Sequence, residues 1–150
     1  MSILQRADIE RFVIIKIYNY FVYFPCSGTD NRLAVCADLL TDIWSWRDYY
    51  RDCKCVLAGD FNTNLDSRDE ISRCLNDFIS DCSLVRCDDL FPSQKVNTYV
   101  NLSFNQESHI DYVLVSDASV VSEFAVLDPD INFSDHLPLL AVVFFVSFRY

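Results

Sequence analysis

The pattern of hydrophobic and polar positions changes its period along the 150-residue chain, and each change predicts a different element. The segment Glu10–Pro25 is dense in Ile, Val, Tyr and Phe, which favours a long β-strand followed by a polar turn. From Arg32 to about Tyr50, apolar residues recur every three or four positions, which predicts an amphipathic helix. Asp30 or Asn31 is the expected N-cap of that helix.

The central part of the chain combines a short apolar run with a second helical period. Val56–Ala58 is typical of a buried strand, and Asn64–Arg68 is a polar loop. Asp69–Cys82 has helical spacing, Leu84–Arg86 favours a short strand, and Asp88–Gln94 is expected to be a loop.

Further strands are predicted towards the C-terminus. Val96–Phe104 and Ile110–Ser116 are expected to form a hairpin-like pair joined by Asn105–His109. Val120–Leu127 predicts another strand, and Leu137–Ser147 a last, fully buried one. Because strands and helices mix throughout, with no internal repeat, the chain is expected to form a layered α/β domain.

The composition excludes several classes of protein. With 51% hydrophobic and 15% aromatic residues the chain can bury a core, which argues against intrinsic disorder. The longest apolar runs, Phe12–Pro25 and Leu137–Phe148, fall short of the ~18 to 20 residues of a membrane span. The charged N-terminus MSILQRADIER disfavours a secretory signal peptide, so we expect an intracellular protein, nuclear or cytoplasmic, without a membrane partner.

The cysteines and the net charge limit the candidate chemistry. Seven cysteines form an odd number without repeated CxxC spacing, which favours reduced, structural thiols; zinc bound with His109 or His136 is a minor alternative. The net charge of −10 is opposite to the basic footprint of most nucleic-acid-binding proteins. Either the basic surface lies on sequence outside this chain, or nucleic acid is not bound tightly.

The stretch Cys55–Asn64 carries the first candidate chemistry. Gly59 is one of only two glycines, at a point where backbone can approach a ligand closely. If the strand stays extended, Asp60 and Asn62 point the same way and Phe61 points into the packing. A carboxylate beside an amide suits metal-assisted attack on phosphate. The alternative is an ordinary strand exit in which both side chains bond the local backbone.

Two more polar groups lie at the ends of apolar runs. Asp111 precedes the apolar residues 113–115 and is costly to bury unless it is paired. Asp135 and His136 immediately precede the terminal strand. Taken one at a time, these are ordinary turn or structural residues. With Asp60 they place four carboxylate or imidazole groups at strand ends, where catalytic groups on a rigid sheet tend to lie.

Three motifs, in order, resemble the endonuclease/exonuclease/phosphatase superfamily, whose fold is deoxyribonuclease I-like: GDFN, SHIDYVLVS and SDHLPL. They occupy Gly59–Asn62, Ser108–Ser116 and Ser134–Leu139. VYFPCSG at Val22–Gly28 makes the chain most similar to endonuclease domains of non-LTR retrotransposons. The resemblance implies a four-layer α/β sandwich truncated at the N-terminal side: residues 12–150 match the C-terminal part of the family domain, and residues 1–11 are a non-matching leader.

The resemblance also implies a role for each motif residue. Asp60 would align or deprotonate the attacking water and, with Asp135, would belong to a Mg²⁺ (or Mn²⁺) site. His136 would stabilise the charge that develops on phosphorus, and Asp111 would orient its imidazole. These roles agree with the local chemistry, since an Asp-held imidazole is a fixed donor and hard oxygen ligands suit Mg²⁺.

The remaining implied contacts are with substrate. Asn62 would bind the scissile phosphate, and Tyr23 matches a tyrosine that contacts it. The resemblance implies the DNA phosphodiester backbone as substrate and, in the full-length protein, a fused reverse transcriptase.

The chain departs from the family pattern in two places. The family's metal-binding Glu has no counterpart before residue 12, since Glu10 lies in the wrong context, and Cys26 stands where abasic-site enzymes commonly carry Asn. We therefore expect a truncated copy with exposed apolar strand faces and weak or no activity. Two alternatives stay open: a phosphomonoesterase acting on a phosphoinositide or nucleotide, and a catalytically dead remnant or interaction module.

Overall fold

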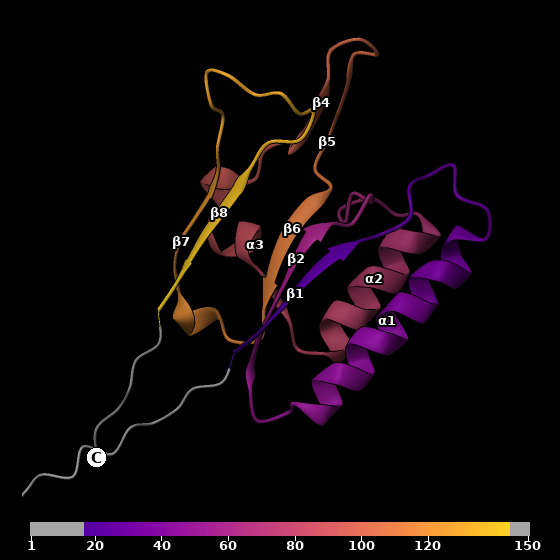
Figure 1. Ribbon diagram of the computed structural model, residues 1–150, viewed down its shortest axis with the longest axis vertical. Coiled ribbons are helices and arrows are strands. Elements are labelled where there is room, and N and C mark those ends of the chain that lie inside the picture. The colour runs from indigo at the N-terminus through magenta and orange to yellow at the C-terminus, as the bar shows by residue number, and fades with distance from the viewer. Residues whose placement is uncertain (1–16, 145–150) are drawn as a thin grey trace, which may run out of the picture.

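A four-stranded sheet lies between two helices on one face and a two-stranded sheet on the other, a mixed α/β fold (Figure 1). The computed structural model describes residues 17–144. The strands of the central sheet, in spatial order, are β1 (Ile17–Tyr23), β2 (Lys54–Asp60), β6 (Asp111–Val115) and β3 (Val85–Arg86). β1 runs parallel to β2, whereas β6 is antiparallel to both β2 and β3.

The other elements surround this sheet. They are α1 (Arg32–Tyr49), α2 (Glu70–Asp81), α3 (Cys87–Leu90), η1 (Pro92–Gln94), β4 (Tyr99–Asn101), β5 (Gln106–Ser108), η2 (Ala118–Val120), β7 (Val121–Val126) and β8 (Leu139–Val143). β4 pairs with β5, and β7 pairs with β8, both antiparallel. Among residues 17–144, no helix is long and apolar enough to cross a membrane.

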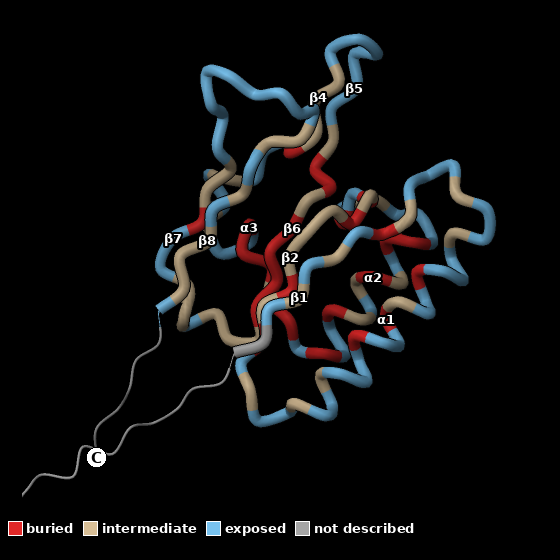
Figure 2. Tube along the Cα trace, in the orientation of Figure 1, coloured by how far each residue is buried: buried red, intermediate tan, exposed pale blue. Residues whose placement is uncertain are grey.

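Alternation along the central strands divides the core into two layers. Leu57, Tyr112 and Leu114 are buried towards α1 and α2. Val113 and Val115, their neighbours on β6, pack on the opposite side with Phe124 of β7. Figure 2 shows the resulting line of buried residues along the central strands. This alternation puts Asp60 and Asp111, at the ends of β2 and β6, on the face that β7 and β8 also cover.

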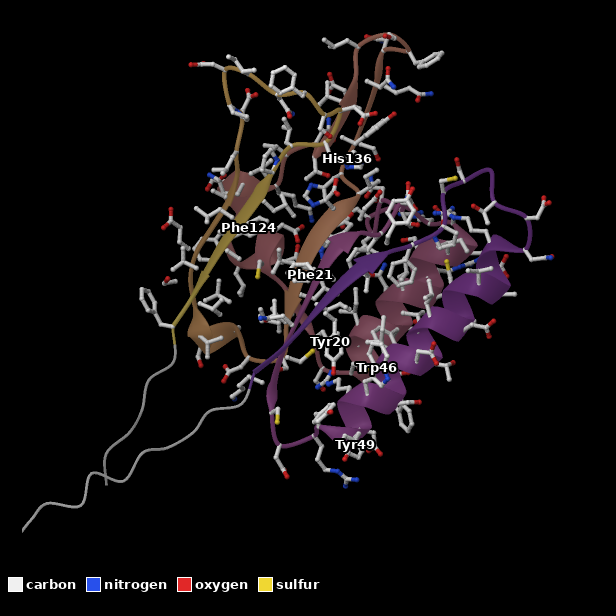
Figure 3. All side chains as sticks on the ribbon, in the orientation of Figure 1. Tyr20, Phe21, Trp46, Tyr49, Phe124 and His136 are labelled. Atoms are coloured by element: carbon white, nitrogen blue, oxygen red, sulfur yellow. The ribbon has the colours of Figure 1, made fainter. Side chains whose placement is uncertain are left out.

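The two long helices, α1 and α2, lie where the sequence predicted them. Asp69 caps α2, because its carboxylate accepts the N–H of Ser72 at 2.8 Å. Asn31 occupies the N-cap position of α1, but it is left-handed (φ 53°) and makes no side-chain capping bond. Trp46 of α1 stacks on Tyr20 of β1 at 5.5 Å, while Phe21 lies on the other side of the strand (Figure 3).

The predicted hairpin between Val96–Phe104 and Ile110–Ser116 is wrong. The hairpin is formed by β4 and β5, and β6 pairs with β2 and β3 in the central sheet. Its turn contains Asn105 in a left-handed conformation (φ 50°). The segment has no Asn-Gly or Asp-Gly pair, the strongest sequence signal for a tight hairpin turn.

Two other elements differ from the prediction. Asp88–Gln94 is not a plain loop, since α3 and η1 occupy it, with Pro92 beginning the second. The terminal strand covers Leu139–Val143 and is only partly buried, because one face packs on the central sheet while Leu140 is 38% exposed. The N-terminal strand is described from Ile17, so the predicted part at residues 10–16, like residues 145–147, lies outside the described residues.

Candidate active site

The register of the central sheet brings three polar residues into one row. Tyr23 of β1 is the partner of Asp60 in β2, and Asp60 is the partner of Asp111 in β6. Residues in register on neighbouring strands project to the same face of a sheet. The two carboxylates are therefore adjacent although about fifty positions separate them in the sequence, and Tyr23, 72% exposed, lies beside them.

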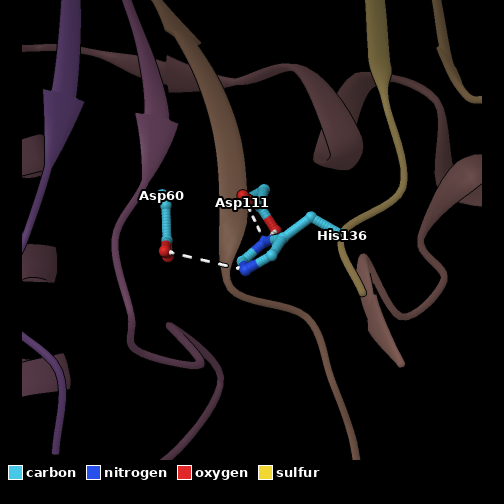
Figure 4. Close-up of side chains that lie close together, drawn as sticks. All are labelled: Asp60, Asp111 and His136. Carbon is cyan, nitrogen blue, oxygen red and sulfur yellow. Dashed lines mark hydrogen bonds and ion pairs between the residues drawn. The ribbon is translucent and has the colours of Figure 1, made fainter. Parts of the chain in front are cut away.

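His136 completes the cluster from another part of the chain (Figure 4). Its Nδ1 lies 3.1 Å from Oδ1 and 3.0 Å from Oδ2 of Asp111. Its Nε2 points towards Asp60, with 4.0 Å to Oδ2. That second distance is too long for a hydrogen bond. Nε2 and the Asp60 carboxylate can therefore both engage a third group placed between them.

Backbone pairing with the β4 segment fixes the position of His136. The N–H of Leu137 donates to the carbonyl of Thr98, and the N–H of Val100 donates to the carbonyl of Asp135, each at 2.7 Å. The ring of Tyr99 also meets the imidazole at an angle of 64° with 5.1 Å between centroids. The segment before β8 is thereby held at the end of the central sheet.

Thr98 is a site residue that the sequence analysis missed. It is fully buried, and its hydroxyl donates to Oδ2 of Asp111 at 2.7 Å while accepting the N–H groups of Ile110 and Asp111. Asp111 is thus held by Thr98 on one side and faces His136 on the other. Thr98 lies in a run of mixed polarity that predicts a strand, so only the distant pairing with Asp111 reveals its role.

The turn after β2 is not extended, contrary to the geometry assumed for Asp60 and Asn62. Asn62 is left-handed (φ 49°), and its N–H donates to Oδ1 of Asp60 at 2.7 Å. Its amide Nδ2 donates to Oδ2 of Asp60 at 3.0 Å and to the carbonyl of Phe24 at 2.8 Å. The two side chains are therefore side by side because the chain turns, and Asn62 supports both oxygens of Asp60.

Phe61 points into the packing, as predicted. It is 1% exposed, stacks on Phe24 at 5.1 Å and meets Tyr112 edge-on at 5.5 Å. Full burial of such a side chain contributes roughly 1.5 to 3 kcal/mol. Gly59 precedes the turn with φ 146°, and a Cβ there would lie 2.0 Å from the carbonyl oxygen of Val22. The close approach of β1 to β2 at this point therefore requires glycine.

The surroundings of the cluster raise the pKa of both Asp60 and His136. Burial raises the pKa of the Asp60 carboxyl; the N–H of Asn62 acts against this, and the charge of Asp111 adds to it. Partial burial by itself would lower the pKa of His136, but the hydrogen bond to Asp111 and the charges of Asp111, Asp60 and Asp135 raise it above its usual value. Asp60 is thereby a better proton acceptor, and His136 a more strongly cationic donor.

The donor set also fits a divalent cation. Within residues 17–144, one group has metal-ligand spacing: Asp60, Asp111 and His136 each offer an atom within 4.8 Å of the others. Each carboxylate oxygen of Asp60 accepts one bond from Asn62 and keeps a lone pair. Hard oxygen donors of this kind suit Mg²⁺ or Mn²⁺. No cysteine joins this group, and all seven cysteines are free.

The predicted site residues differ in how tightly the structure joins them. Asp60, Asn62, Asp111 and His136 are in direct or near contact. The side chain of Asp135 is exposed, and it reaches Asp60 and His136 only through its charge. Tyr23 joins the site through its place in the register alone.

Comparison with known proteins reveals relatives of the same architecture. The sequence matches the endonuclease/exonuclease/phosphatase family over residues 6–136. A search of curated proteins found no match.

Solved structures with the same fold include three enzymes of nucleic-acid or phosphate chemistry. The endonuclease domain of TRAS1, a telomere-specific non-LTR retrotransposon, has a TM-score of 0.65 at 14% identity, over 89% of this chain and 59% of that one. An AP endonuclease from Archaeoglobus fulgidus has a TM-score of 0.62 at 17% identity, over 85% of this chain and 61% of that one. The 3′ phosphatase NExo from Neisseria, bound to a product DNA hairpin, has a TM-score of 0.60 at 20% identity, over 87% of this chain and 62% of that one.

This chain thus spans about three fifths of the length of these structures. At these identities the structural likeness establishes the fold, a deoxyribonuclease I-like α/β architecture. The sequence match covers well over half of the chain. The chain therefore belongs to the endonuclease/exonuclease/phosphatase family.

Proposed function

We propose that the protein hydrolyses phosphodiester bonds of DNA with Mg²⁺ or Mn²⁺, as an endonuclease of the retrotransposon type. The observation that carries this proposal is the placement of Asp60 and Nε2 of His136 on two sides of one gap, with Asp111 behind the imidazole. A hydrolytic centre needs a proton acceptor for water and a fixed donor for the charge that develops on phosphorus. Asp60 and His136 supply this pair.

Each residue has one task in the proposed reaction. Asp60 accepts a proton from the attacking water, and its raised pKa suits that task. His136 donates from Nε2 to a non-bridging phosphate oxygen, while Asp111 holds Nδ1 and favours the charged imidazole. Asn62 holds Asp60, and it reaches the phosphate by exchanging one of its two present amide bonds. Tyr23 offers its hydroxyl from the adjacent position of the same row.

The cation would be held by Asp60 and Asp135, and it would supply charge neutralisation at the phosphate. Asp135 suits this role because its carboxylate is exposed and its charge acts on both Asp60 and His136.

The acidic charge of the chain favours a second candidate, a phosphomonoesterase. A net charge of −10 opposes tight binding of a DNA duplex but tolerates a small phosphate ester. One structure of the same fold is a 3′ phosphatase. The same Asp60 and His136 geometry would serve a terminal phosphate.

A substrate panel distinguishes the two candidates. The purified chain, with Mg²⁺ or Mn²⁺, is incubated in parallel with supercoiled plasmid, an oligonucleotide bearing a 3′-phosphate, and inositol phosphates. The endonuclease proposal predicts relaxed circles from the plasmid and no release of inorganic phosphate. Release of inorganic phosphate without nicking would contradict the endonuclease proposal and favour the phosphomonoesterase. An endonuclease of the retrotransposon type would act in the nucleus or cytoplasm and, in the full-length protein, would be fused to a reverse transcriptase.

A further inference from the structure

Arg32, the first residue of α1, ties together the two segments that lead out of β1 and β2. Its Nε donates to the carbonyl of Pro25 at 2.8 Å. Its Nη2 donates to the carbonyl of Asn62 and to the hydroxyl of Thr63, each at 2.6 Å. Three acceptors from two segments thus converge on one guanidinium that lies partly buried between them.

The bond to Asn62 matters because of the conformation of that residue. A non-glycine residue at φ 49° lies in a sparsely populated region, which asparagine enters more readily than most residues, and the bonds of Asn62 add to that preference. In this conformation the carbonyl of Asn62 points to Arg32, while its N–H and side-chain amide point to the two oxygens of Asp60. A rotation of the backbone at Asn62 would disturb both sets of bonds together.

The bond from Arg32 to Pro25 lies beside a bond that Asn62 makes to the same segment. Nδ2 of Asn62 also donates to the carbonyl of Phe24, the residue before Pro25. Arg32 and Asn62 therefore hold neighbouring carbonyls of the segment after β1, and the guanidinium closes a ring of bonds around the turn. Only a planar fork with donors in several directions reaches all three acceptors at once, which arginine has and lysine lacks.

We propose that Arg32 is a positioning residue that holds Asn62 in its left-handed conformation and, through Asn62, holds the carboxylate of Asp60. It touches neither the reacting atoms nor the cluster around His136. The effect on rate rests on the proposed function, whereas the effect on the turn does not.

Native-state amide exchange and turnover together test this role. The variants are Arg32→Ala and Arg32→Lys, with Arg47→Ala as the matched control. Arg47 belongs to the same helix and also donates to a backbone carbonyl, that of Cys82, at the far end of α1. Amide exchange is followed at Asn62, with Leu57 as the reference in β2.

We expect Arg32→Ala to speed exchange at Asn62 by about tenfold or more, the factor that corresponds to losing a bond from a charged donor. Arg32→Lys should give a smaller increase, since an ammonium replaces only part of the fork. Exchange at Leu57 should not change, and Arg47→Ala should leave Asn62 as in the unsubstituted chain. In turnover, kcat should fall by about tenfold with a smaller change in KM, because the contacts of His136 and Tyr23 with the substrate remain.

Unchanged exchange at Asn62 in Arg32→Ala, or an equal increase in Arg47→Ala, would overturn the proposal. If no substrate is turned over, the proposed function fails while the exchange result still decides the role of Arg32. If Arg32→Ala does not fold, Thr63→Val removes one of the three acceptors in a nearly isosteric way. It should then speed exchange at Asn62 in the same direction, and no increase there would count against the proposal.

Discussion

Nδ1 of His136 faces both carboxylate oxygens of Asp111, at 3.1 and 3.0 Å, across 25 positions of sequence. Two independent supports maintain this pair: the hydroxyl of Thr98 behind Asp111, and the backbone pairing of β4 with the segment before β8. The imidazole is therefore fixed with Nε2 directed towards Asp60.

Replacing Asp111 by Asn should lower kcat by about 10²–10⁴, the range usually contributed by a positioned acid or base. An amide neither attracts the cationic imidazole nor fixes the same tautomer. The measurement is the single-turnover nicking rate of supercoiled plasmid. Asp117→Asn is the matched control, since Asp117 is paired with Lys54 away from the cluster. A rate for Asp111→Asn within twofold of that control would exclude a His–Asp pair in catalysis.

Gly59→Ala should destabilise the fold by at least about 1–3 kcal/mol, the usual cost of one strained backbone conformation. The new Cβ would meet the carbonyl oxygen of Val22 at 2.0 Å, so β1 or β2 must shift at the edge of the site. Gly28→Ala is the control, because a Cβ at Gly28 meets nothing within 4 Å. Urea denaturation compares the two variants. Equal free energies of unfolding would show that the strand approach tolerates a side chain.

Removing the N-cap of α2 by Asp69→Ala should cost about 1 kcal/mol near neutral pH. The hydroxyl of Ser67 and the N–H of Ser72 lower the pKa of the Asp69 carboxyl below its usual value. A lowered folded pKa means that the charged carboxylate stabilises the fold above the normal carboxyl range, and that this contribution is lost as the pH falls through the folded value. The difference between the two chains should therefore shrink in urea titrations as the pH falls below the normal carboxyl range of about 3.9. A difference that is constant with pH would indicate capping without a charge contribution.

The exposed aromatic residues of β1 should make the chain bind hydrophobic dyes and self-associate. Phe21 is 86% exposed and Tyr23 72%, on the strand that pairs with β2 alone among residues 17–144. Exposed apolar patches bind hydrophobic dyes and promote association. Phe21→Thr should reduce both dye fluorescence and the apparent size on gel filtration, with a stability change under about 1 kcal/mol. Phe133→Thr, at a fully exposed loop position, is the comparison. A dye-silent monomer before substitution would disprove this expectation.

The sequence predicted the elements whose signal is local. The three- and four-residue spacing located α1 and α2, and the apolar run before Gly59 located β2. The burial of Phe61 followed from strand alternation. The convergence of Asp60, Asp111 and His136 was anticipated from their places at strand ends and from the resemblance. The register explains it, since Asp60 and Asp111 are direct partners.

What the sequence did not predict depends on contacts between distant segments. The partners of β6 are β2 and β3, and nothing local in Ile110–Ser116 favours them over the neighbouring β5. The role of Thr98 exists only once Asp111 lies beside it. The left-handed turn at Asn62 is held by Arg32, thirty positions away, so an extended exit was the reasonable local prediction.

The central claim is that Asp60, Asp111 and His136 form one metal-dependent hydrolytic centre. Its most direct test is plasmid nicking with the protein in excess, where even a slow rate is measurable, for the unsubstituted chain and His136→Ala with Mg²⁺ or with a chelator. We predict nicking that requires the metal and falls by at least about 10² in His136→Ala, the loss expected when one well-placed donor is removed. Nicking that persists at the same rate in His136→Ala, or nicking by the unsubstituted chain that the chelator does not abolish, would contradict the claim.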